Sequence, residues 1–114
     1  MNAAEVQQGL LDTIIRAAQI KAEWELLRTK VLSNERLPRP IRLAVELIAI
    51  RAEEILDGMA DHVIWGFEHL EDGLLTAAWQ EWGKCQNEMS LIQAADRTVS
   101  RLVRKSFSET QHGQ

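Results

Sequence analysis

The only two prolines of this 114-residue chain, Pro38 and Pro40, are separated by a single residue, and glycine is sparse. Pro38 disfavours helical geometry in the residue before it, whereas Pro40 suits the first turn of a new helix. β-branched residues do not alternate with polar ones as they would in a half-buried strand. The sequence therefore predicts an all-α protein with one sharp break at 33–40.

Three long helices are predicted, over about 3–32, 39–70 and 74–107. Asn2 is a suitable N-cap for the first, and Glu5 is placed to reach back to it. Each helix has an apolar stripe with steps of three and four residues, as one buried helical face requires. The stripes are Val6, Leu10, Ile14, Ala17, Ile20, Trp24, Leu27 and Val31, then Ile41, Val45, Ile48, Ala52, Ile55, Met59, Val63, Gly66 and Leu70, then Leu75, Ala78, Trp82, Cys85, Met89, Ile92, Val99 and Leu102.

Helices of similar length joined by short connections pack as antiparallel neighbours. The expected fold is therefore an elongated antiparallel three-helix bundle. A four-helix bundle is the alternative, because Asp57-Gly58 in the second helix has the sequence of a turn. Residues 1–107 are expected to form a single helical domain, and residues 108–114 a flexible C-terminal tail.

The composition predicts a folded protein of the cytoplasm. The chain is 46% hydrophobic and carries a formal net charge of -4, which does not favour bulk binding to nucleic acid. The single cysteine, Cys85, excludes an internal disulfide and fits a reducing compartment. The N-terminus does not resemble a signal peptide, and no apolar run approaches the ~18 residues of a membrane span.

Charges are segregated along the chain. The stretch from Ala52 to Gly83 holds eight carboxylates and no Lys or Arg, and all the charged residues of the stretch 97–108 are basic. An up-down-up bundle brings these charges to opposite ends, although charge runs are often no more than solvated faces. The acidic pole comprises Glu5, Asp12, Asp57, Asp61, Glu68, Glu71, Asp72 and Glu81, and the basic pole Arg28, Lys30, Arg36, Arg39, Arg42, Arg97, Arg101, Arg104 and Lys105.

Trp65 lies off the apolar stripe of the second helix and within the acidic stretch. Tryptophan is enriched among the residues that dominate protein interfaces. We therefore expect Asp61, Trp65, Glu68 and Asp72 to bind a protein partner. The alternative is that Trp65 packs on Trp79 across the turn between the second and third helices.

The basic pole offers a second kind of site. Arg97, Arg101 and Arg104 form a helical stripe, and together with Arg36 and Arg39 they have the charge to bind phosphates. Aromatic residues are not interleaved with these cations, so the sequence does not predict base reading. Cations near helix C-termini also stabilise a helix, which is the alternative reading.

The second helix is more apolar than its two neighbours in a simple bundle would cover. Leu43, Leu47 and Ile50 fall outside its stripe and are expected to form a homodimer interface. The alternative is a compact four-helix monomer that buries the second helix centrally.

The sequence predicts neither a metal site nor a catalytic one. His62 and His69 are about 10 Å apart along one helix, too far to share an ion. Cys85 lies on an apolar stripe and is expected to act as a small hydrophobe. The pair Glu54-x-x-Asp57 resembles the Mg²⁺-binding acidic helices of all-helical nucleotide pyrophosphohydrolases, but the matching acidic motif on a preceding helix is absent.

These patterns favour a small non-enzymatic protein, without a cofactor, that captures a basic surface of another protein, including one that normally holds nucleic acid. Inhibitors, immunity proteins and phage host-takeover proteins are often built in this style. A nucleic-acid-associated accessory protein that uses the basic pole is the second interpretation. A Mg²⁺-dependent nucleotide pyrophosphohydrolase is the third.

Overall fold

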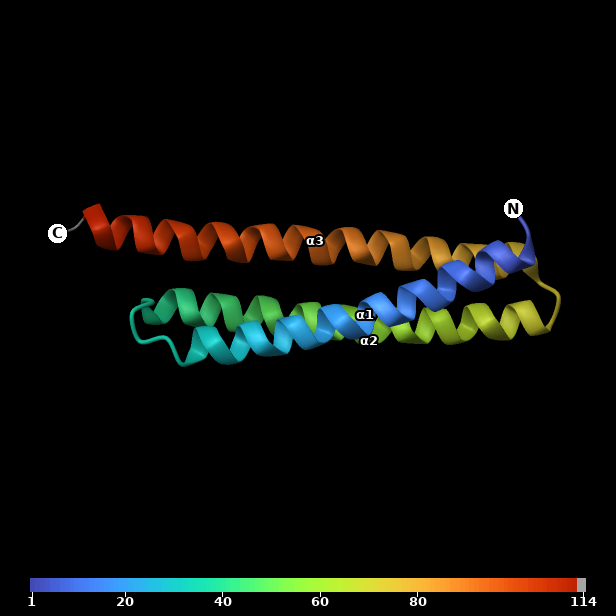
Figure 1. The fold of residues 1–114 in the computed structure, drawn as a ribbon, viewed down its shortest axis with the longest axis horizontal. Helices are drawn as coiled ribbons and strands as arrows, with labels where there is room; N and C mark the ends of the chain where they lie inside the picture. Colours follow the sequence, from blue (N-terminus) through green and yellow to red (C-terminus); the bar gives the residue numbers. More distant parts are fainter. Residues whose placement is uncertain (113–114) are drawn as a thin grey trace.

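The computed structural model describes the backbone of residues 1–112 and the side chains of residues 1–107. Three helices, α1 (Ala3–Leu32), α2 (Arg39–Glu71) and α3 (Leu75–His112), follow one another in the chain. Sequence neighbours run antiparallel, so the N-terminus lies at the same end as the α2–α3 turn (Figure 1). The predicted all-α, elongated three-helix bundle is confirmed.

The helix ends lie close to the predicted positions. Gly58 lies inside an unbroken α2, so the alternative with a fourth helix starting there is wrong. α3 continues past Phe107 to His112. The flexible tail expected at 108–114 includes 113–114, which lie outside the described residues, and it stays a prediction.

Local hydrogen bonds explain where α1 starts and where α2 stops. The Asn2 side chain accepts a 2.9 Å hydrogen bond from the backbone N–H of Glu5, as predicted for an N-cap. After α2, Gly73 has a φ of 74°, which a residue without a Cβ adopts freely. The backbone N–H of Leu74 then donates to the carbonyl of His69 at 2.8 Å, which closes the helix in a Schellman motif.

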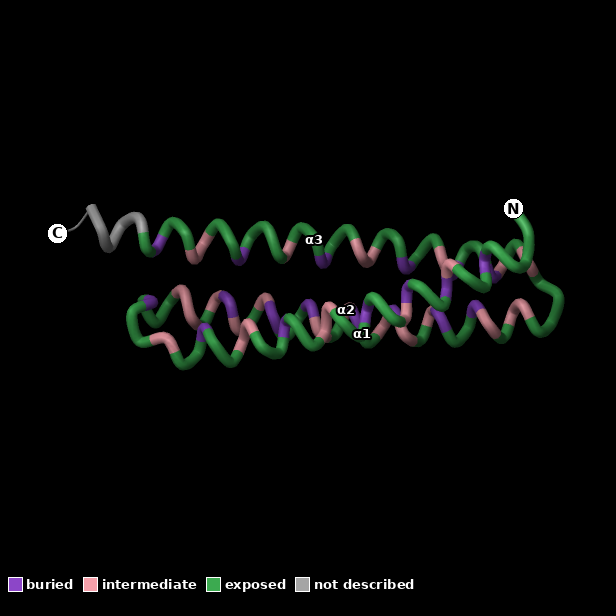
Figure 2. Tube along the Cα trace, in the orientation of Figure 1, coloured by how far each residue is buried: buried purple, intermediate pink, exposed green. Residues whose placement is uncertain are grey.

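The core is a line of buried residues that follows the length of the bundle (Figure 2). α2 packs against both α1 and α3, which contact each other less. For this reason its buried face is wider than one stripe. Ala49 and Leu56, outside the predicted stripe, are fully buried, while Ile48 and Ile55 on the stripe are half-buried.

The molecule is a rod of 64 × 20 × 16 Å with a radius of gyration of 17.9 Å, against about 13 Å for a compact chain of this length. Its accessible surface of 7525 Å² exceeds the ~6,300 Å² typical of a compact 13.0 kDa protein. Several large apolar side chains are therefore left on the surface. Over the residues described, none of the helices has an apolar stretch long enough for a membrane span.

Candidate functional site

The four residues predicted to bind a protein lie together on one face of α2. Asp61, Trp65, Glu68 and Asp72 follow one another at steps of four, three and four residues, which keeps side chains on one side of a helix. All four are exposed, and the Trp65 side chain is 47% exposed. These four residues form what we call the acidic face of α2.

Trp65 rests on a histidine rather than on another tryptophan. Its ring meets the His62 ring edge-on, with centroids 5.4 Å apart and planes at 79°. Among the side chains described, no ring contact joins Trp65 to Trp79. Trp79 lies on α3 and is itself 48% exposed, so the two indoles do not cover each other.

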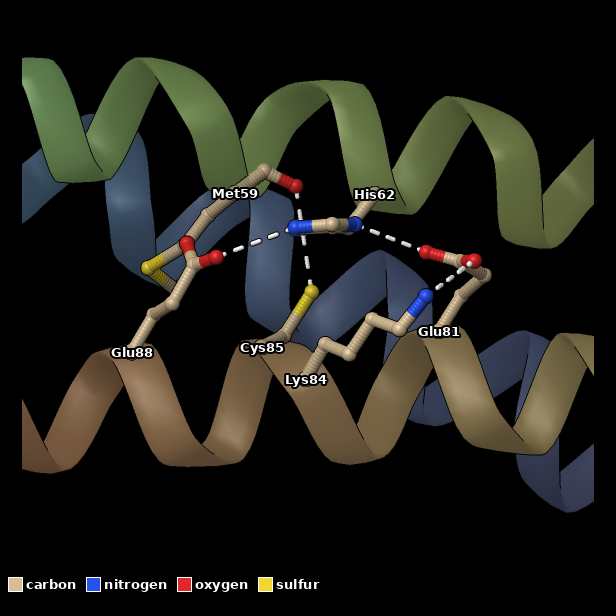
Figure 3. A network of polar contacts seen from close by, with 6 residues as sticks. All are labelled: Met59, His62, Glu81, Lys84, Cys85 and Glu88. Atoms are coloured by element: carbon tan, nitrogen blue, oxygen red, sulfur yellow. Dashed lines mark hydrogen bonds and ion pairs between the residues drawn. The ribbon is translucent and has the colours of Figure 1, made fainter.

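His62 in turn is held between two carboxylates of α3 (Figure 3). Its Nδ1 lies 2.7 Å from an Oε2 of Glu81, and its Nε2 lies 3.0 Å from an Oε1 of Glu88. An imidazolium donates to both carboxylates, whereas a neutral imidazole donates to only one. The other oxygen of Glu88 is buried and has no hydrogen-bond partner in the described part of the chain, so His62 is the main partner of this carboxylate.

Glu81 is the most buried acid of this network. Burial raises the pKa of its carboxyl, but hydrogen bonds from Lys84 and His62 and the charges of both outweigh burial and leave the pKa below 4.5. Lys84 lies one turn further along α3, with Nζ 3.0 Å from Glu81. Glu81 is therefore a charged group that ties α3 to α2.

Cys85 lies directly behind this network. Its thiol donates a weak 3.8 Å hydrogen bond to the carbonyl of Met59, and the residue is 1% exposed. Burial, followed by the negative charges of Glu88 and Glu81, raises the pKa of the thiol to about 11. A protonated, buried thiol is a poor nucleophile, which agrees with the prediction of a small hydrophobe.

The link from Trp65 through His62 to Glu81 and Glu88 was not predicted from the sequence. The sequence signal was weak: Glu81 and Glu88 are seven residues apart, on the same side of α3 as the apolar stripe. Which α2 residue they would meet depends on how α3 docks on α2. That relation is set by the whole core rather than by a local motif.

The carboxylates that resemble a magnesium site face cations instead. Arg28 contacts Glu53 at 2.9 Å, Arg51 contacts Glu54 at 3.2 Å, and Lys21 contacts Asp57 at 2.7 Å. In the described residues no group of three or more His, Cys, Asp or Glu side chains is arranged to hold a metal ion.

The predicted phosphate-binding arginines lie on two segments that extend to the end of the molecule opposite the N-terminus (Figure 1). They come from two elements, the start of α2 with the loop before it and the C-terminal half of α3. All are exposed, and none has an ion-pair partner among the side chains described: Arg36, Arg39, Arg97, Arg101 and Arg104.

The residues predicted to form a dimer interface are exposed on the side of α2 opposite its buried residues. Leu43, Leu47 and Ile50 are 46%, 69% and 38% exposed. Beside them, Leu47 and Leu91 border a shallow apolar hollow of about 480 Å³ between α2 and α3. α2 is central in the bundle, yet this side of it stays uncovered.

Comparisons with protein-family models, with curated proteins and with solved structures found no match to this chain.

Proposed function

We propose that this protein is a non-enzymatic binding module of the cytoplasm that captures a basic surface of another protein with the acidic face of α2. Asp61, Glu68 and Asp72 supply the charge, and Trp65 supplies the apolar anchor. Small inhibitors, immunity proteins and phage host-takeover proteins are the functional classes that this style of surface fits, by analogy alone.

The observation that carries the proposal is the way Trp65 is held. The indole is half exposed, and the His62 ring that supports it is fixed on both sides by α3 carboxylates. A large side chain held in one orientation loses little conformational entropy when a partner covers it. This combination of area and rigidity is typical of residues that dominate binding energy.

Charge favours a basic partner. Asp61, Glu68 and Asp72 have no ion-pair partner among the described side chains, so their charges face solvent. Carboxylates whose charge faces solvent accelerate the encounter with a cationic surface and disfavour the encounter with an anionic surface.

The test is capture of a partner from source-cell lysate by the tagged full chain, with and without nuclease. We expect a stoichiometric protein partner that survives nuclease, is lost with the double variant Trp65→Ala, Glu68→Lys, and is kept by Trp79→Ala. Trp79 is a matched control because its exposure, 48%, is nearly that of Trp65, 47%. A partner retained equally by the double variant would contradict the proposal.

A nucleic-acid-associated role is the second candidate, favoured by five arginines that have no ion-pair partner among the described side chains, at the start of α2 with the loop before it and in the C-terminal half of α3. Its signature would be co-purifying nucleic acid whose affinity falls steeply with salt. The double variant Arg97→Ala, Arg101→Ala would lose that nucleic acid, whereas Trp65→Ala would keep it.

A further inference from the structure

The uncovered side of α2 continues beyond the acidic face towards the N-terminus of the helix. Leu43, Leu47 and Ile50 lie on it at steps of four and three residues. We call these three residues the apolar segment of α2. Leu43 and Leu47, which are neighbours on one helical face, are 46% and 69% exposed.

Charges of opposite sign border the apolar segment. Arg39 begins α2 on the N-terminal side, and Glu54 and Asp57 follow on the C-terminal side, where Arg51 contacts Glu54 and Lys21 of α1 contacts Asp57. At 1.5 Å per residue, Arg39 and Asp57 lie about 14 and 13 Å from a midpoint between Leu47 and Ile50. The same face is thus basic, apolar and acidic in turn, with the apolar part in the middle.

About one helical turn further from this midpoint, a second basic residue and a second acidic residue lie on the same two sides. Arg36 in the loop and Asp61 on the helix are exposed, and neither has an ion-pair partner among the side chains described. A face whose parts are basic, apolar and acidic in this order is complementary to a second copy of itself that runs in the opposite direction. A rotation about the midpoint superposes the basic part of one copy on the acidic part of the other.

We propose that the apolar segment binds a second copy of this chain, with the two α2 helices antiparallel across a two-fold axis between Leu47 and Ile50. Leu47 of each copy packs against Ile50 of the other. Arg36 of each copy then lies over Asp61 of the other, and Arg39 lies over Asp57, which Lys21 of its own chain also contacts.

Charge complementarity distinguishes a second copy from an unrelated partner. An unrelated helix needs only apolar residues against Leu43, Leu47 and Ile50, whereas opposite charges at matched distances on both sides are what a two-fold axis requires. The elongated shape of the molecule agrees with a dimer. A standard interface buries about 800 Å² per copy. The accessible surface of the rod exceeds that of a compact chain of its size by more than this area.

Asp61 belongs both to the acidic face of α2 and to the proposed dimer interface. Trp65, Glu68 and Asp72 lie beyond the outermost ion pair, nearer the C-terminal end of the helix. Variants at Leu47 therefore test the dimer, and variants at Trp65 test the protein capture, without a shared residue.

The first test is sedimentation equilibrium of the full chain over a concentration series. Leu47→Glu should raise the dimer dissociation constant at least about 100-fold, because two buried leucines are lost at once. Leu26→Glu on α1 is the matched control, because Leu26 is also strongly exposed, at 56%. This variant should leave the dimer dissociation constant within about twofold of the wild-type value. Circular dichroism checks that both variants remain folded.

Charge reversal tests the register. Arg36→Glu or Asp61→Arg alone should weaken the dimer about tenfold, because each dimer loses two ion pairs and gains two repulsions. The double variant carrying both changes should restore the wild-type constant. If it binds no better than the single variants, the proposed register is wrong.

Spin labels at Ile64→Cys test the antiparallel arrangement, because the buried Cys85 is shielded from the label. The proposed axis places the two labelled positions roughly 45 Å apart, against about 10 Å for parallel helices. A short distance would overturn the arrangement. A wild-type chain that remains monomeric up to about 1 mM, or that pairs only with a different protein, would overturn the dimer itself.

Discussion

One imidazole connects the exposed face of α2 to the interior of the bundle. His62 supports the ring of Trp65 on one side and binds Glu81 and Glu88 on the others. A change at any of these residues is therefore felt in two ways, in the stability of the α2–α3 contact and in the orientation of the exposed indole. Glu81 is the group of this network whose pKa is clearly shifted, to below its ordinary value.

The pKa of Glu81 lies below its ordinary 4.5 in the folded chain, so the folded state favours the ionised form. The stabilisation is present above pH 4.5 and is lost as the pH falls through the folded-state pKa. We expect Glu81→Gln to lower the free energy of unfolding by about 1 kcal/mol at pH 7 and to flatten its decline in acid. Urea unfolding at a series of pH values measures both.

Glu71→Gln is the control for that series, because Glu71 is exposed and has no ion-pair partner among the side chains described. An equal change in both variants would show that the Glu81 network contributes nothing specific.

The raised pKa of the Cys85 thiol predicts that the protein loses stability at alkaline pH. The thiol pKa is raised from 9.0 to about 11, so the folded state holds the proton more tightly than the unfolded chain. The resulting stabilisation is complete below pH 9.0 and disappears as the pH rises through about 11. Its size is on the order of 2 kcal/mol. Cys85→Ala should remove this alkaline dependence, and a wild-type chain whose stability is unchanged between pH 8.5 and 11 would contradict the prediction.

At the scale of the helices, what could be predicted from the sequence was local. Asn2 as a cap, the break at Pro38 and the turn at Gly73 depend on the residues beside them, and all three are in the structure. Which side of α2 meets α1 and which meets α3 depends on the packing of all three helices. The burial of Ala49 and Leu56 was missed for that reason.

The same limit applies to the candidate site. The position of Trp65 and its acidic neighbours off the apolar stripe is a property of one helix, and it left exposure of Trp65 and packing on Trp79 as alternatives. The support of Trp65 by His62 involves a neighbour on the same helix, but the fixation of His62 requires two residues of another helix. Sequence periodicity carries no information on that pairing.

Two glycines of the helices show how packing overrides helix propensity. A Cβ on Gly9 would lie 2.5 Å from the ring of Trp82, whereas a Cβ on Gly83 meets nothing within 4 Å. Gly9→Ala should therefore lower the free energy of unfolding by about 1–2 kcal/mol despite the better helix former. Gly83→Ala should raise it by about 0.5–1 kcal/mol.

Thermal and urea unfolding of the two variants measure these changes. Stabilisation by Gly9→Ala would mean that the close approach of α1 to α3 at Trp82 is absent in solution.

At the scale of the whole molecule, the uncovered side of α2 carries both proposed surfaces. The apolar segment lies near the basic end, and Trp65 lies near the α2–α3 turn at the opposite end. In the antiparallel dimer the two Trp65 residues would stand roughly 50 Å apart, at opposite ends of the assembly. Such a dimer would present two separate acidic faces. A basic partner with repeated sites would bind both faces with higher affinity than one, because the two faces are linked in one assembly.

The most direct measurement is calorimetric titration of the captured partner with the wild-type chain, Trp65→Ala and Trp79→Ala. If the acidic face of α2 is the binding site, Trp65→Ala raises the dissociation constant by at least about 30-fold, the ~2 kcal/mol of an interface hot spot. Trp79→Ala, equally exposed but on α3, leaves it within about twofold. Equal affinities for the two variants, or a larger loss with Trp79→Ala, would contradict the proposed site.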